Sequence, residues 1–220
     1  MSKSKEKSVK INNDHLLEVT ATAPKNAQVT DEQLIQWINS RRSIGNLELP
    51  APTHEQIEAA VYCAATAPDH KKLQPWRFIV TEGDARQELG RALLAAADAK
   101  AVRDGETLSD KDRQKMATLP LRAPVIITVV TQMEVHKKVP EFEQMLSAGA
   151  AVQNLILALK AQGFSTLWRT GLLCNEPAVK AYFNVSAEDY VTAFVYTGSS
   201  PCNEPARKPI DIEPLLRFES

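Results

Sequence analysis

Two adjacent arginines and a serine, Arg41, Arg42 and Ser43, stand where a predicted helix ends and a loop begins. Two guanidinium groups and a hydroxyl can make several charge-assisted hydrogen bonds to one phosphate group. Arginines near the C-terminal end of a helix also interact favourably with the helix dipole while they stay hydrated. The triplet by itself therefore leaves open a phosphate-binding role and a purely structural role.

A second segment whose residue types could bind a ligand or catalyse a reaction runs from Ala67 to Trp76. It reads Ala-Pro-Asp-His-Lys-Lys-Leu-Gln-Pro-Trp. Its two prolines restrict the path of the loop between a predicted helix and a predicted strand. The polar residues between them, Asp69 and His70 included, cannot all belong to a core, so they are expected to line a site. A rigid connector is the alternative interpretation.

A third segment, Gly163 to Gly171, predicts a strand that ends in Trp168, Arg169 and Thr170. Loops that follow strands are common places for binding and catalytic residues. Taken alone, the same pattern is also typical of a core tryptophan next to a surface arginine.

Hydrophobic periodicity and start signals predict the elements that position these segments. Helices are expected from Thr30, whose spacing to Gln33 is that of a capping box, and from Thr53, which repeats the box with Gln56. We expect further helices over 84–102 with Asp84 as the cap, from Ser109, and over 141–161 and 175–183, and strands over 76–81, 125–131, 164–169 and 189–197. This alternation predicts an α/β or α+β domain.

Two of these elements are exceptionally apolar. Val125–Thr131 is nearly all β-branched, which predicts a strand buried on both faces. The helix Glu141–Ala161 has almost no polar face, so we expect it to be buried all round. Its small residues Ala148–Ala151 would let another backbone approach closely. This helix and the proline-rich arm after Pro201 favour an oligomer, with a well-buried core helix of a monomer as the alternative.

The overall composition excludes several classes of protein. A net charge of -1 gives no overall electrostatic attraction to nucleic acid or anionic lipid. Three cysteines without a CxxC pair argue against a disulfide framework and a zinc site, and the four histidines lack metal-ligand spacing. Without disulfides, a reducing cytoplasm is the simplest compartment to expect. No signal peptide or membrane span is predicted. Residues 1–29 are expected to be a flexible extension, and residues 30–220 one domain.

Known nucleotide and hydrolase motifs are also missing from the sequence. There is no G-x-G-x-x-G, Walker A, G-x-S-x-G or H-E-x-x-H motif. Five ordered blocks remain and together resemble the FMN-dependent nitroreductase superfamily, most of all its small YdjA-like branch of NAD(P)H nitroreductases. The blocks are Asn39–Ser43; Ala67–His70 with Gln74–Trp76; Arg122–Val130; Ser147–Gly149; and Gly163–Phe164 with Trp168–Arg169.

The resemblance covers roughly residues 31–200 and implies a fold. That fold is an α+β domain with a central mixed, largely antiparallel sheet flanked by helices. It implies an intertwined homodimer with an exchanged C-terminal arm and two FMN sites at the subunit interface. The apolar helix 141–161 would then lie at or near the dimer seam.

Site residues follow from the resemblance position by position. Arg41, Arg42 and Ser43 resemble ligands of the FMN phosphate and ribityl chain, and His70, in the Pro68-Asp69-His70 loop, resembles a flavin contact from the other subunit. Trp168, Arg169 and Thr170 resemble a segment of the partner chain that runs past the isoalloxazine ring or the phosphate of FMN. Arg207 or Lys208 would add a phosphate charge. Thr66 stands where this branch often has an arginine, which implies that one polar contact is lost or replaced.

The implied reaction is a ping-pong hydride transfer from NADH or NADPH, through FMN, to a small-molecule oxidant such as a nitroaromatic or a quinone. The flavin carries the difficult chemistry, so no side-chain catalyst is assigned and no metal is expected. His70 is the best candidate for proton donation, with flavin orientation as its alternative role. Two other readings stay open, namely another flavin enzyme on this fold (a dehydrogenase, a dehalogenase or a flavin-consuming enzyme) and a non-catalytic flavin carrier or interaction module.

Overall fold

A sheet of four antiparallel strands in the order β1-β2-β4-β3 forms the centre of the structure. The computed structural model describes residues 29–202 and 205–219. The elements in chain order are α1 (Asp31–Ser40), α2 (His54–Ala64), η2 (His70–Lys72), β1 (Trp76–Glu82), α3 (Ala85–Arg103), α4 (Asp110–Thr118), η3 (Leu119–Arg122), β2 (Val125–Thr131), α5 (Glu141–Ala161), β3 (Ser165–Arg169), α6 (Pro177–Tyr182), β4 (Tyr190–Gly198) and η4 (Glu213–Leu215). The predicted α+β class is confirmed. An isolated bridge between Ser43 and Thr166 is the only parallel pairing among the described residues.

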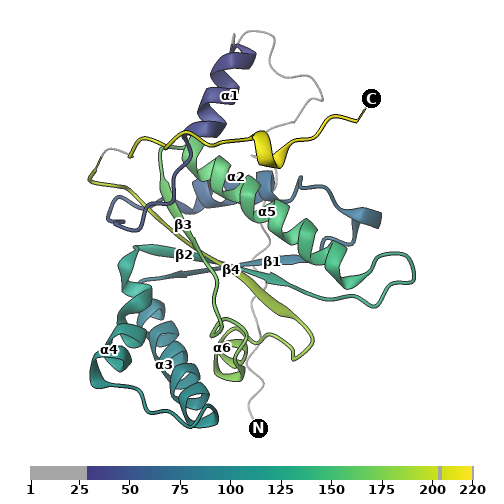
Figure 1. Cartoon of the computed structure of the whole chain (residues 1–220). Coiled ribbons are helices and arrows are strands. Elements are labelled where there is room, and N and C mark those ends of the chain that lie inside the picture. Colours follow the sequence, from purple (N-terminus) through teal and green to yellow (C-terminus); the bar gives the residue numbers. More distant parts are fainter. Residues whose placement is uncertain (1–28, 203–204, 220) are drawn as a thin grey trace.

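Helices cover both faces of this sheet. Figure 1 shows α2 and α5 over one face and α3, α4 and α6 over the other. Alternate residues of β2 enter different cores: Ile127 packs in the cluster with α2 and α5, whereas Ile126 packs in the cluster with α3 and α6. All seven residues of β2 are buried, as the continuous apolar run predicted. A strand with two covered faces needs no polar alternation.

The start signals read from the sequence are mostly confirmed. Thr30 with Gln33, and Thr53 with Gln56, form complete capping boxes, and Ser109 caps α4 by accepting from the amide of Asp112. The prediction for Asp84 is wrong in its mechanism, because its side chain makes no capping hydrogen bond. Asp84 has a helical backbone (φ -70°, ψ -21°) instead of the extended one that a capping side chain requires.

The expectation that α5 is buried all round is also wrong for the single chain. One side packs into the core through Ala148, Ala151 and Leu155. The other side leaves Phe142 and Leu146 exposed by 63% and 67%. The apolar character of α5 therefore exceeds what one chain buries.

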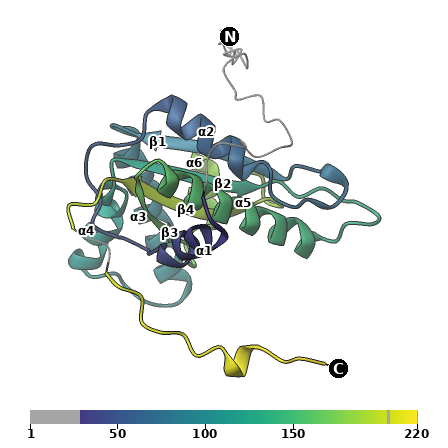
Figure 2. The ribbon, with the colours of Figure 1, turned by 90° about the horizontal axis from the view of Figure 1, so that it is seen from above.

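Two further segments are apolar and exposed. Helix α1 buries none of its residues, and Leu34 and Ile35 are more than half exposed. The C-terminal arm 205–219 is exposed along its length, including Phe218, and Figure 2 shows it running away from the rest of the domain. Among the described residues, no helix is long and apolar enough to cross a membrane. The expected N-terminal extension lies, up to residue 28, outside the described residues.

Candidate functional site

The segment that follows α1 lies against the edge strand β3. The amide of Ile44 donates to the carbonyl oxygen of Thr166 over 2.9 Å, and Ser43 forms the parallel bridge to the same strand. Arg41 donates from Nη1 to the hydroxyl oxygen of Ser43 at 3.3 Å. Arg41 and Arg42 are partly buried, and Ser43 is exposed. The first and third predicted segments are therefore neighbours within one chain.

Arg207 joins this group from the C-terminal arm. Its Nε donates to the carbonyl oxygen of Asn39 at 3.0 Å, and its Nη2 donates to that of Arg41 at 2.6 Å. No ion pair joins Arg41, Arg42 or Arg207 to a carboxylate within residues 29–202 and 205–219. Arg41, Arg42 and Arg207 thus meet at the end of α1, and no described carboxylate neutralises their charges.

Trp168 and Arg169 diverge because successive residues of a strand point to opposite faces. Arg169 lies on the α3 side, with its guanidinium 5.5 Å from the ring centre of Tyr196. Its Nε is buried and has no hydrogen-bond partner among the described residues. Trp168 is 38% exposed, and Thr170 is exposed just beyond the strand. A buried N–H without a partner is uncommon and indicates a missing acceptor such as a ligand, an ion or water.

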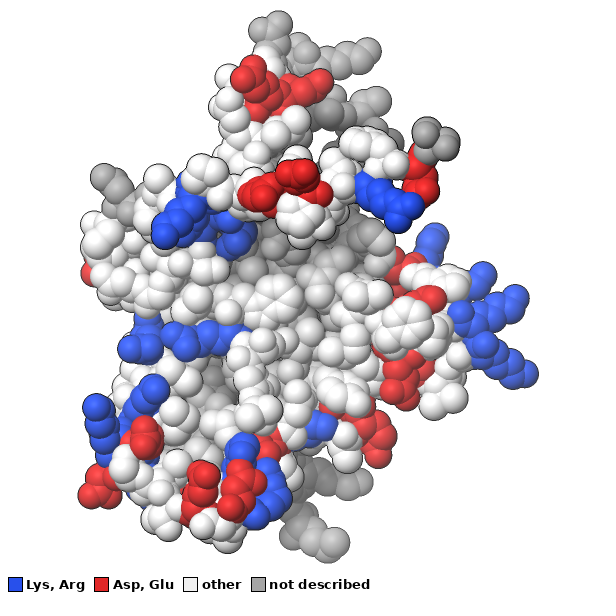
Figure 3. All heavy atoms as spheres, in the orientation of Figure 1, with Lys and Arg blue, Asp and Glu red and all other residues white. Residues whose placement is uncertain are grey.

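A groove of about 600 Å³ opens beside Arg169, and we call it the arginine groove. It is lined by Gly45, Asn46, Leu47, Leu121, Arg122 and Arg169. Arg122 is the last residue of η3, is exposed, and makes no ion pair with any described residue. Figure 3 shows Lys and Arg side chains at several places on this face of the molecule, among them the left side, where an uncharged band separates an upper from a lower group. In the sequence, Arg122 belonged only to one of the five blocks that carry the family resemblance, and no role was assigned to it.

Two buried groups near the arginine groove keep their protons. Burial raises the pKa of Tyr196 to about 12, with Arg169 acting in the opposite direction. Burial likewise raises the pKa of the Cys174 thiol. Neither group supplies an anionic nucleophile at neutral pH, which agrees with the absence of a nucleophile motif in the sequence.

A second groove, of about 520 Å³, shares Leu47 and Leu121 with the arginine groove. Its one arginine, Arg86, already donates to the carbonyl oxygens of Gly83 and Ala123, at 3.1 and 2.7 Å. This second groove therefore offers an anion fewer free donors than the arginine groove.

The loop with His70 lies elsewhere. Figures 1 and 2 both place η2 at one end of the molecule and the segment after α1 toward the other end. His70 Nδ1 lies 2.6 Å from Oε2 of Glu143, and Ser147 Oγ donates to the carbonyl oxygen of Pro68 at 2.8 Å. One chain thus does not bring Pro68, Asp69 and His70 to Arg41 or Arg169.

Thr66 stands at the end of α2, before this loop. Its hydroxyl donates to the carbonyl oxygen of Cys63 at 2.7 Å, within its own helical turn. That bond uses the hydroxyl proton locally. The threonine therefore supplies no long cationic donor at this position.

The donor set fits an anionic, phosphate-bearing group. Arginine donors, a serine hydroxyl and a buried unpartnered Nε–H are the groups that hold phosphates and other anionic oxygens in proteins. In residues 29–202 and 205–219, no three His, Cys, Asp or Glu side chains are grouped so that they could hold a metal ion.

The chain and its fold have counterparts in a known family. The model of the nitroreductase family matches residues 38–199. An Escherichia coli (strain K12) relative, YdjA, whose name assigns it provisionally to the NAD(P)H nitroreductases, is 39% identical over 165 residues, which are 75% of this chain and 87% of the relative. The chain therefore belongs to the nitroreductase family.

Solved structures share the fold at lower sequence identity. A nitroreductase-like family protein from Bacillus cereus superposes with a TM-score of 0.73 at 19% identity, covering 88% of this chain and 99% of the other. The FMN-dependent nitroreductase NfnB from Mycobacterium smegmatis, solved in complex with NADPH, gives 0.65 at 18% identity, covering 85% and 98%. These likenesses concern the fold.

Proposed function

We propose that this protein is an FMN-dependent NAD(P)H oxidoreductase that reduces nitroaromatic, quinone or similar small acceptors by a ping-pong hydride transfer. Membership of the nitroreductase family supports the reaction class, and names of relatives and fold neighbours that mention NAD(P)H and FMN support the cofactors. We assign the role to residues 30–220.

The observation that carries the proposal is the meeting of three segments along β3. Arg41, Ser43 and Arg207 gather at its start, and Arg169 ends it with a buried Nε–H that lacks a partner. The first group suits the phosphate of FMN, with Arg42 beside it. Arg169, flanked by Trp168 and Thr170, suits an anionic or carbonyl oxygen of the flavin.

When bound, FMN would accept a hydride from NAD(P)H and pass it to the oxidant. The protein supplies binding, orientation and electrostatics. Fixed guanidinium groups stabilise negative charge that develops nearby, because they are already oriented before the reaction. Cys174 and Tyr196 stay protonated and take no nucleophilic part.

We further propose that the active form is a homodimer with its sites at the subunit interface. The His70 loop lies at the opposite side of the molecule from the Arg41 group, so a second subunit would bring Pro68, Asp69 and His70 to the flavin. Exposed apolar side chains on α1, α5 and the arm, such as Leu34, Leu146 and Phe218, supply the surface that such a dimer needs.

Initial-rate kinetics test the reaction type. Rates are measured while NADPH or NADH and a quinone are varied together. Parallel double-reciprocal lines are expected, since the first product leaves before the second substrate binds. Intersecting lines would exclude the ping-pong order. Bound FMN without any NAD(P)H oxidation would favour the non-catalytic carrier instead.

A further inference from the structure

The loop between α2 and β1 has an unusual backbone. Lys71, Lys72 and Gln74 have φ values of 65°, 56° and 48°, in the left-handed region that side chains other than glycine rarely adopt. Such conformations persist only where the surroundings determine them, and they cluster at functional sites. The contacts that hold this loop therefore bear on its function.

Three side-chain contacts hold the loop. Asp69 accepts the amide of Gln74 at 2.7 Å and closes the loop on itself. The other two contacts come from α5, where Ser147 donates to the carbonyl oxygen of Pro68 and Glu143 meets His70. Glu143 and Ser147 are four residues apart and share one face of the helix. The first two turns of α5 thus fix the loop on both sides of Asp69.

The contact between Glu143 and His70 sets the state of the imidazole. An ionised carboxylate only accepts hydrogen bonds, so Nδ1 of His70 carries the proton at a separation of 2.6 Å. The Nε2 atom is then the nitrogen left for another partner, whether the ring is neutral or charged. Both side chains are partly open, at 47% exposure for His70 and 33% for Glu143, so a ligand can reach the ring.

We propose that Glu143 is a positioning residue that holds His70 with Nε2 presented to the flavin or to the bound acceptor. This inference rests on the proposed function, in which His70 completes a site from the second subunit. A carboxylate that orients an imidazole through Nδ1 is a recurrent arrangement, because it fixes both the tautomer and the ring direction. The pair could not be predicted from the sequence, since its members are 73 residues apart.

The test compares Glu143→Ala and Glu143→Gln with Glu141→Gln in the full-length protein. Glu141 is an exposed carboxylate in the same helical turn, and its side chain makes no hydrogen bond or ion pair in the described part of the chain. Two quantities are measured: the tautomer of His70 from nitrogen NMR of the imidazole ring, and the dissociation constant of FMN. The NMR readout needs no flavin, so it stands apart from the proposed function.

We expect Nδ1–H in the wild type and in Glu141→Gln, and a shift toward Nε2–H, the form that a free imidazole prefers, in Glu143→Ala. The FMN dissociation constant should rise about tenfold in Glu143→Ala and stay unchanged in Glu141→Gln. Glu143→Gln keeps the shape of the side chain, so a similar loss there would exclude simple loop collapse as the cause.

Two results would overturn the inference while leaving the proposed function intact. One is an unchanged His70 tautomer in Glu143→Ala. The other is a changed tautomer with the affinity and spectrum of bound FMN unaltered. A wild-type protein that shows the Nδ1–H tautomer and binds no FMN would instead refute the proposed function, and with it the ligand-facing role of His70.

Discussion

Arg207 donates its Nη2–H to the carbonyl oxygen of Arg41 at 2.6 Å, which ties the C-terminal arm to the segment after α1. The two residues are 166 positions apart in the chain. The same guanidinium therefore holds the backbone of this segment and adds a charge beside it.

Replacing Arg207 should therefore weaken FMN binding. We expect Arg207→Gln to raise the FMN dissociation constant about tenfold or more, because a charge-assisted donor and a backbone contact are lost together. Titration of the apoprotein with FMN measures this change. Lys208→Gln is the matched control, since Lys208 makes no hydrogen bond or ion pair in the described part of the chain. A larger loss in Lys208→Gln would assign the phosphate charge to Lys208.

Arg41 should recognise the phosphate and not the flavin ring. We expect Arg41→Gln to lower the affinity for FMN about tenfold while leaving that for riboflavin unchanged, so that the preference for FMN over riboflavin shrinks. Arg91→Gln, on α3 and paired with Glu88, should keep the wild-type preference. An equal loss for both flavins would argue against a phosphate-binding role.

Exposed apolar residues on α5 should form the dimer seam. Leu146→Glu is expected to shift the protein toward monomers in sedimentation and to reduce FMN binding with it, because it places a charge in an apolar interface. Val102→Glu is the control, since Val102 is 78% exposed at the end of α3, on the other face of the sheet. If Leu146→Glu remained dimeric and bound FMN normally, the seam would have to lie elsewhere.

Gly90 is required by the packing of α3 against α4. A Cβ at this position would overlap the carbonyl oxygen of Ala117. We expect Gly90→Ala to destabilise the fold by about 1–3 kcal/mol, the usual cost of overpacking, and thermal unfolding measures it. Gly171→Ala should be close to neutral, because no atom lies within 4 Å of its Cβ position. An unchanged Tm for Gly90→Ala would show that α4 moves freely away.

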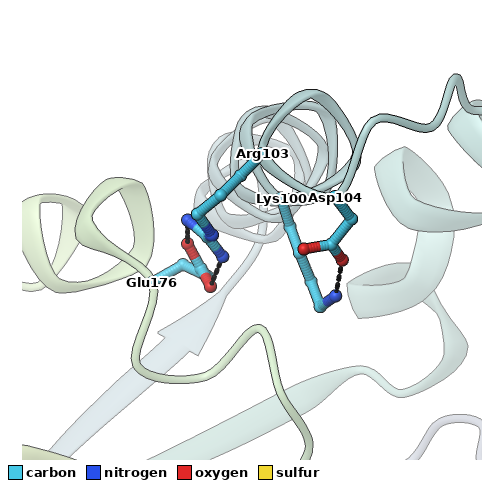
Figure 4. A network of polar contacts seen from close by, with 4 residues as sticks. All are labelled: Lys100, Arg103, Asp104 and Glu176. Carbon is cyan, nitrogen blue, oxygen red and sulfur yellow. Dashed lines mark hydrogen bonds and ion pairs between the residues drawn. The ribbon is translucent and has the colours of Figure 1, made fainter.

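The ion pair between Arg103 and Glu176 should make stability depend on pH. Figure 4 shows the paired groups, 2.7 Å apart, beside the pair of Lys100 and Asp104. The hydrogen bond from Arg103, partly offset by desolvation, holds the pKa of Glu176 below the usual 4.5. A lowered pKa stabilises the fold above pH 4.5 and loses that contribution as the pH falls through the lowered value.

The Tm of Glu176→Gln should therefore lie slightly below that of the wild type at pH 7. The gap should close as the solution is acidified below pH 4.5. Glu188→Gln provides a surface carboxylate without a described partner for comparison. A gap that widens in acid would contradict the assigned direction of the pKa shift.

Much of the fold could be predicted from local signals. Capping boxes at Thr30 and Thr53 and the β-branched run of β2 have short-range physical causes, so they were predicted correctly. The opposite directions of Trp168 and Arg169 also follow from the alternation of a strand. Which of the two faces the core did not follow: the alternative of a core tryptophan next to a surface arginine is reversed, since Trp168 is exposed and Nε of Arg169 is buried.

The remaining features depend on contacts between distant segments. The exposure of Leu146 depends on which side of α5 meets the sheet, and a nearly uniform apolar sequence does not encode that choice. The pairing of Glu143 with His70 and the place of Arg122 beside Arg169 arise only when separate elements pack together. The roles of the predicted site residues stay predictions, although their positions are now defined.

The most direct test of the central claim is the visible spectrum of the freshly purified protein under anaerobic conditions, before and after addition of NADPH or NADH. We expect a flavin band at about 450 nm that bleaches on addition of the nucleotide, since the cofactor would carry the hydride. A colourless protein that also fails to take up added FMN would contradict the central claim. The arginines beside β3 would then serve a different anion.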